Sequence, residues 1–158
     1  MKKILSIILL AVLVLAVPSR SGAQEVIHEP IEQYIVTPEE LEDELYCDSL
    51  ELLAICVEAE AGNQGLKGKR LVADVILNRV DSDKFPNNIE GVITQSNQFS
   101  SYTDGGMDKV IEPSEETIKA VQMELGSRLD CDILYFTAGR YNPYCKPAYK
   151  YKDHYFGY

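Results

Sequence analysis

Glu60 is the residue whose type and position in this sequence most directly suggest chemistry. It follows Leu53 by seven residues, and Cys56 and Val57 follow Leu53 by three and four. A helix would place all four on one apolar face. A carboxyl group on such a face either pairs with a cation or stays protonated, and a protonated carboxyl can act as a general acid. On spacing alone, an inward glutamate on one helix is more often a structural residue than a catalytic one.

The helix that carries this carboxyl is predicted to begin at Asp48 or Ser49 and to end near Gly62. Glu51 and Glu58, which are seven residues apart, would lie together on a different face of this helix. We expect that face to be solvated.

The remaining elements are predicted from apolar periodicity and from turn residues. Helices are expected over 37–46, 66–80, 89–94 and 113–125, a polar loop over 95–106, and strands over 133–137 and 154–158 that flank a long loop. The predicted fold class is therefore α+β and mostly helical, a single domain with a small C-terminal β-sheet.

The N-terminal region has the layout of a secretory signal peptide. Two lysines precede an apolar run from Ile4 to Val17, and small residues end at Ala23. The sequence thus predicts a signal peptide over 1–23, an acidic lead-in over 24–47 and one domain over 48–158. We expect a secreted protein, with retention as an uncleaved membrane anchor as the alternative.

Charge and histidine content limit the partners. Three of the 15 basic residues and none of the 25 acidic ones lie in the predicted leader, so the remainder has a net charge of −13. Nucleic acids and anionic membranes require clustered Lys and Arg, so neither is expected as a partner after cleavage. With His28 and His154 as the only histidines and no paired-ligand spacing, no metal or other cofactor is expected. We expect a monomer.

Four cysteines follow the leader, namely Cys47, Cys56, Cys131 and Cys145. Export would place them where disulfides persist, so two bridges are predicted in one of three connectivities. The sequence does not choose among these, although a bridge from Cys131 to Cys145 would staple the tyrosine-rich end. The alternative for Cys56, on an apolar helix face, is a buried thiol.

Several short motifs occur in a fixed order from about Leu50 to the end of the chain. They are Val57–Gly62, Gly68, Val72–Val80, Phe85–Asn87, Val92–Ile93, Gln98–Ser100 with Asp104–Gly105, Ala138–Gly139 and His154–Phe156. Together they resemble the catalytic domain of the spore-cortex-lytic and cell wall hydrolase family. The ordered set is specific, whereas any one motif alone means little.

This resemblance implies a role for Glu60, because in that family the glutamate of the Ala-Glu-Ala element is the catalytic residue. It also implies a compact lysozyme-like domain with a cleft that acts on the glycan strands of peptidoglycan. Asn78 and Arg79 match a pair at the end of the second helix. Arg79 would hold a cleft wall or serve as a structural cation at the helix end.

Candidate substrate-binding residues lie in the matched polar loop. Gln98 and Ser100 would bind sugar hydroxyls while Phe99 packs beneath them, and Asp104 belongs to the same loop. The loop would then form one lip of the cleft.

The C-terminal third supplies further candidates, because it contains seven of the ten tyrosines interleaved with basic residues. Aromatic rings of this kind stack on sugar faces, and Tyr141 and Tyr144 are the candidates for such contacts. Core or edge positions are the alternative for these tyrosines. His154 is expected to be structural and to anchor the hairpin by a hydrogen bond.

The type of reaction depends on whether a second carboxyl is present. Glycoside hydrolysis usually requires two carboxyl groups. Asp104 is the only acidic residue of the matched loop, and its Asp-Gly context is also an ordinary turn signal. Lytic transglycosylation requires one glutamate and is therefore the preferred prediction. The alternatives are an amidase, which would use a zinc site or a Cys-His pair, and a noncatalytic wall-binding module that uses the tyrosines.

Overall fold

The computed structural model describes residues 38–158, so the predicted signal peptide and the lead-in up to residue 37 lie outside the described residues. The elements are α1 (Pro38–Ala61), α2 (Gly65–Val80), α3 (Ile89–Thr94), α4 (Ser100–Thr103), the 3-10 helix η1 (Met107–Lys109), α5 (Glu115–Gly126), β1 (Tyr135–Ala138), β2 (Pro147–Tyr151) and β3 (His154–Gly157). The predicted fold class, mostly helical with a small C-terminal sheet, is confirmed. None of the helices within 38–158 is both long and apolar enough to span a membrane.

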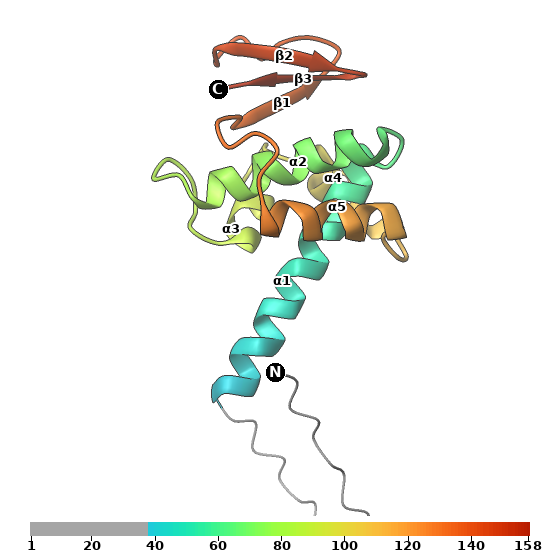
Figure 1. Cartoon of the computed structure of the whole chain (residues 1–158), viewed down its shortest axis with the longest axis vertical. Coiled ribbons are helices and arrows are strands. Elements are labelled where there is room, and N and C mark those ends of the chain that lie inside the picture. Colours follow the sequence, from blue (N-terminus) through green and yellow to red (C-terminus); the bar gives the residue numbers. More distant parts are fainter. Residues whose placement is uncertain (1–37) are drawn as a thin grey trace, which may run out of the picture. The chain divides into compact units, whose positions relative to one another are not determined.

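Helix α1 is continuous, whereas the sequence predicted two helices that meet near Asp48. No Gly or Pro lies between Pro38 and Ala61, and the Ser49 hydroxyl donates to the carbonyl of Leu45 at 2.9 Å. A side chain that bonds within the helix in this way does not cap a new one. The first half of α1 extends away from the other helices (Figure 1), and its second half enters the core.

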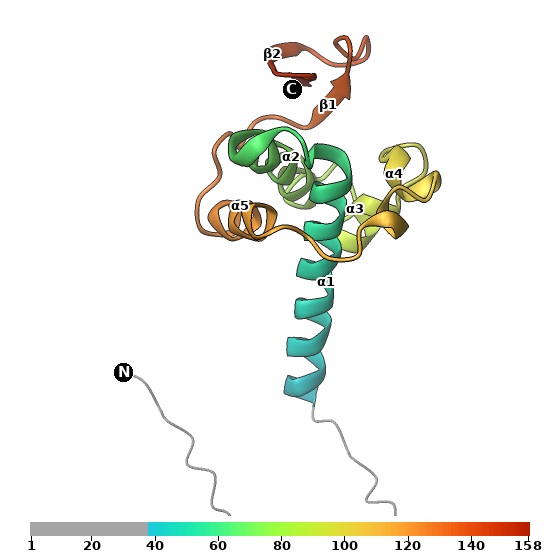
Figure 2. The same cartoon turned by 90° about the vertical axis from the view of Figure 1, so that its right-hand side faces the viewer.

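Helix α2 is the centre of the domain, and all its residues from Leu71 to Arg79 are buried. Val72 and Ile76 pack with α1 and α3 in one apolar cluster. Leu71 and Val75 pack in a second cluster beneath the sheet. The helix is therefore covered on both sides, which explains why its sequence is apolar around so much of its circumference (Figures 1 and 2).

The sheet has three antiparallel strands in the order β1-β3-β2, one more than predicted. Strand β2 lies within the segment that was predicted to be a long loop. It is an edge strand that begins with Pro147, and its pairing with β3 is irregular between Pro147 and Lys150. Proline is tolerated at sheet edges because its missing N–H is not needed there. The pairing places Ala138 of β1 opposite His154 of β3.

The Asn78–Arg79 pair fastens α2 to the segment that precedes β1. Asn78 Nδ2 donates to the carbonyls of Asp130 and Ile133 at 2.8 and 2.9 Å, and Arg79 Nε donates to the carbonyl of Leu134 at 2.7 Å. The Arg79 guanidinium also lies 4.9 to 5.6 Å from the ring centroids of Phe85, Phe99 and Tyr135. These contacts fix the sheet relative to the helices.

All four cysteines are free in the structure, so the two predicted bridges are not formed there. Cys56 is fully buried, as the alternative interpretation of its position predicted. Burial raises the pKa of this thiol, the charge of Glu60 raises it further, and the charge of Arg79 acts in the opposite direction. The Cys56 thiol therefore stays protonated within the core.

Candidate active site

A cleft of about 420 Å³ lies between the end of α1, the segment around α4 and the sheet. Its lining combines polar side chains with the phenyl ring of Phe136 and the imidazole of His154. The lining residues are Glu60, Asn97, Gln98, Ser100, Thr103, Phe136, Thr137, Ala138 and His154. Glu60 is the only carboxylic acid among them.

Glu60 is held at the end of α1 through one of its two carboxyl oxygens. Oε1 accepts hydrogen bonds from the hydroxyl of Ser101 at 2.6 Å and from its backbone N–H at 3.3 Å. Oε2 has no hydrogen-bond partner within residues 38–158. The sequence predicted an apolar environment for this carboxyl. The structure instead shows a half-buried carboxyl group. Ser101 holds one of its oxygens, and the other oxygen makes no hydrogen bond within residues 38–158.

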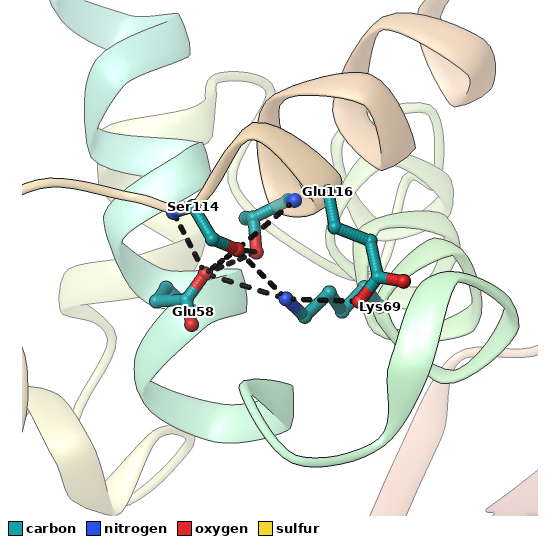
Figure 3. Close-up of polar contacts among 5 residues, drawn as sticks. Glu58, Lys69, Ser114 and Glu116 are labelled. Atoms are coloured by element: carbon teal, nitrogen blue, oxygen red, sulfur yellow. Dashed lines mark hydrogen bonds and ion pairs between the residues drawn. The ribbon is translucent and has the colours of Figure 1, made fainter.

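Glu58, the other glutamate of the same motif, lies in a different environment (Figure 3). Its Oε2 accepts hydrogen bonds from the Ser114 hydroxyl at 2.7 Å, from the Ser114 N–H at 3.1 Å and from the Thr117 hydroxyl, and lies 3.5 Å from Lys69 Nζ. Burial by itself would raise the pKa of Glu58, but these hydrogen bonds and the Lys69 charge outweigh it and lower the pKa to about 2. Glu58 is therefore ionised near neutral pH and cannot serve as the proton donor.

The prediction that Glu51 and Glu58 share a solvated face is wrong for Glu58, whose side chain is 21% exposed. Glu51 is exposed as predicted. The partner that sequence periodicity missed is Lys69, which is buried on α2 and also lies 3.3 Å from Glu116 Oε2 (Figure 3). This network joins α1, α2 and the start of α5, and so fixes the helix turn that carries Glu60.

The structure places some of the predicted loop residues in the cleft lining and others outside it. Gln98 and Ser100 line the cleft with Glu60. Phe99 is buried beneath them, with its ring centroid 6.1 Å from that of Phe136. Asp104 is exposed and does not line the cleft, and its Oδ1 accepts a hydrogen bond from the N–H of Gly106 at 2.9 Å, as in a turn.

The two candidate tyrosines are not among the residues that line the cleft. Tyr141 packs edge-on against Tyr155, with ring centroids 5.0 Å apart. Tyr144 is 94% exposed. Neither ring therefore contributes to the lining that contains Glu60.

Several cleft residues were missed by the sequence analysis. Asn97 has a φ of 62°, in the left-handed region that Asn adopts more readily than most residues, and its position between two polar residues was the available signal. Ala138 belongs to the matched Ala138–Gly139 motif but was not assigned to the cleft. Thr103, Phe136 and Thr137 gave no such signal, because strand pairing and loop packing bring them to the cleft. His154 was assigned a hydrogen bond that anchors the hairpin. Its side chain makes no hydrogen bond with residues 38–158, and its Nδ1 is buried without a partner.

The fold and this cleft define a class of protein, a small helical domain with a three-stranded sheet and a single carboxyl in a polar groove. The chain matches the Cell Wall Hydrolase family over residues 63–157, which is more than half of its length. The chain belongs to that family. Glu60 lies three residues before the matched segment.

Solved structures with the same fold support this assignment. The catalytic domain of the germination-specific lytic transglycosylase SleB from Bacillus anthracis is 27% identical, with a TM-score of 0.62, over 70% of this chain and 94% of that one. The catalytic domain of SleB from Bacillus cereus is 28% identical, with a TM-score of 0.63, over 71% and 91%. The lysozyme-like fold implied by the motifs is thereby confirmed.

This chain matches only part of a longer curated relative. The spore cortex-lytic enzyme of Bacillus cereus is 38% identical over 74 residues, which is 47% of this chain. The match spans only 28% of the length of that relative.

Proposed function

We propose that this protein cleaves the glycan strands of peptidoglycan as a lytic transglycosylase, with Glu60 as its single general acid and base. The observation that carries the proposal is that Glu60 is the one carboxylic acid in the cleft lining within the described residues. One of the similar solved structures is the catalytic domain of a lytic transglycosylase, and this similarity supports the same reaction.

The geometry of Glu60 suits this reaction. Ser101 holds Oε1, and a proton on Oε2 would face the bound glycan. Glu60 first gives this proton to the glycosidic oxygen, and the bond from that oxygen to the anomeric carbon breaks. The C6 hydroxyl of the same sugar then attacks the anomeric carbon and returns its proton to the carboxylate. The product has a 1,6-anhydro end and no water is consumed, so a second carboxyl is not required.

Two other functions were open from the sequence. An amidase with a nucleophilic cysteine would need a Cys-His pair in the cleft, and the lining contains His154 but no cysteine. A noncatalytic wall-binding module would depend on the C-terminal tyrosines, and the two candidate rings do not line the cleft. Neither alternative explains a glutamate that lines the cleft and is fixed by one oxygen.

The masses of the products test the proposed reaction. Incubation with purified sacculi is expected to release muropeptides with 1,6-anhydro ends, which are lighter by one water than the reducing ends of a hydrolase. Mass spectrometry distinguishes these products from the free stem peptides that an amidase would release. Reducing ends or free stem peptides as the main products would contradict the proposal.

We also propose export through the signal peptide over 1–23, followed by action in the cell wall as a monomer. The layout of the leader supports this. The intact mass of the secreted protein is expected to be that of residues 24–158. A mass that includes the leader would contradict it.

A further inference from the structure

His154 is a polar residue that the fold buries without a structural hydrogen bond. The side chain is on β3 and only 5% exposed. Its Nδ1 is enclosed and has no hydrogen-bond partner within residues 38–158. A buried polar atom without a partner destabilises a fold, so a nonpolar side chain at this position would be better for stability. Stability therefore does not explain a histidine here.

The imidazole packs against two aromatic rings and lines the same cleft as Glu60. Its ring centroid lies 5.1 Å from that of Phe136 on β1 and 6.1 Å from that of Phe156 on β3. These two rings confine it, so a ligand in the cleft would meet a preorganised group. This is the arrangement of a binding residue rather than of a flexible surface histidine.

The protonation state of His154 also fits a role in binding. Burial lowers the pKa of His154 below its ordinary value of 6.5, although the charges of Glu60 and Asp153 act in the opposite direction. The ring is therefore neutral near neutral pH, and a neutral imidazole has one N–H donor and one acceptor nitrogen. A sugar hydroxyl, which also donates and accepts, matches this group. A neutral ring also leaves the Glu60 carboxyl without a cationic partner in the cleft lining.

We propose that His154 is a substrate-contacting residue, whose imidazole hydrogen-bonds a hydroxyl of the sugar unit bound beside Glu60. This inference rests on the proposed glycan-cleaving function and adds a second polar contact in the same cleft. The contact would orient the sugar relative to the Glu60 carboxyl. Because Nδ1 is enclosed, the contact would be made through the other ring nitrogen, Nε2, on the side of the ring that lines the cleft.

The test compares His154→Leu and His154→Gln with the parent protein, by thermal melting and by the rate of anhydro-end formation from soluble glycan strands. His154→Leu is expected to melt at or above the parent temperature and to lose about a hundredfold in rate, as for removal of one preorganised hydrogen bond. His154→Gln, which keeps a neutral donor and acceptor, is expected to recover part of that rate.

Tyr149→Phe is a matched control, because it removes a polar group from the same sheet but outside the cleft lining. The Tyr149 hydroxyl donates to Asp130 Oδ2 at 2.9 Å. This variant is expected to melt below the parent temperature and to keep the parent rate at a temperature where it is folded. The two variants should therefore show opposite patterns of stability and activity.

The outcomes separate this inference from the proposed function. If Glu60→Gln is inactive but His154→Leu keeps the parent rate, His154 does not contact the substrate and the proposed function stands. If Glu60→Gln is active, the proposed function itself is wrong. A His154→Leu variant that melts well below the parent would show that the imidazole stabilises the sheet and would overturn the inference. A His154→Gln variant as slow as His154→Leu would equally overturn the assigned hydrogen bond.

Discussion

Replacing Glu60 by Gln is expected to lower the rate of glycan cleavage on the order of a thousandfold, because one side chain serves as both acid and base and the amide can do neither. The amide oxygen of Gln can still accept the two hydrogen bonds from Ser101, so the variant should keep its fold. Sacculus binding should also survive. The rate is measured as release of soluble muropeptides, and the fold as the melting temperature.

Glu58→Gln is the matched control for this variant, since Glu58 is two residues away in the same motif and has no place in the cleft lining. Loss of its charge weakens the contacts with Ser114, Thr117 and Lys69. The expected result is a loss of about 1 to 3 kcal/mol in the free energy of unfolding, with turnover retained where the protein is folded. Cleavage that survives in Glu60→Gln, or is lost in a folded Glu58→Gln, would assign the chemistry to a different residue.

The sequence predicted Glu60 because two independent local signals agreed there, the apolar periodicity of a helix and a motif. It could not predict which residues form hydrogen bonds with Glu58 and which with Glu60. Their partners are the residues at 101, 114 and 117, which are 41 to 59 positions away along the chain. Hydrogen bonds over such separations depend on the packing of α4 and α5, which periodicity within one helix does not encode.

The same limit explains the errors in secondary structure. Helix α2 was predicted within a residue because its apolar pattern and burial agree. The break near Asp48 was predicted from residues that favour helix caps, yet Ser49 bonds within the helix and no Gly or Pro ends it. Strand β2 was missed because its pairing with β3 is irregular and it begins with a proline. The pairing of β3 with β1 and β2 brings His154 to the cleft, and this pairing was not visible in the sequence.

A pair of buried carboxyl groups links α2 and α5 away from the cleft. Asp74 and Glu124 are both fully buried. Glu124 is bound by Arg70 Nε and by the N–H of Leu129 at 2.7 Å, and Asp74 Oδ2 accepts from the N–H of Asp130 at 2.9 Å. Asp74 Oδ1 has no donor partner within residues 38–158. Two carboxyl groups can hydrogen-bond each other only through a shared proton, and Oδ1 is the oxygen available to carry it.

This arrangement makes stability depend on pH. Burial raises the pKa of Asp74 to about 8, and the hydrogen bond with Glu124 and its charge raise it as well, against the backbone hydrogen bonds from Asp130 and Leu129. Folded Asp74 therefore retains a proton that the unfolded chain releases above the ordinary value of 3.8. The stabilisation is complete below that value and is lost as pH rises towards 8. Glu58 acts in the opposite sense, since its lowered pKa stabilises the fold above 4.5 and this contribution is lost as pH falls towards 2.

Replacing Asp74 by Asn is therefore expected to remove the fall in unfolding free energy between about pH 6.5 and 8, above the ordinary pKa of His154, where the parent should lose on the order of 1 kcal/mol per pH unit. The Asn side chain can accept from the Asp130 N–H with its oxygen and donate to Glu124 with its amide, and it does not titrate. Denaturant unfolding across this pH range measures the effect. Asp81→Asn is the control, because Asp81 is exposed and pairs with Arg128 at 3.2 Å, so its loss should leave the parent slope unchanged. Equal slopes in the parent and in Asp74→Asn would mean that the shared proton does not reside on this pair.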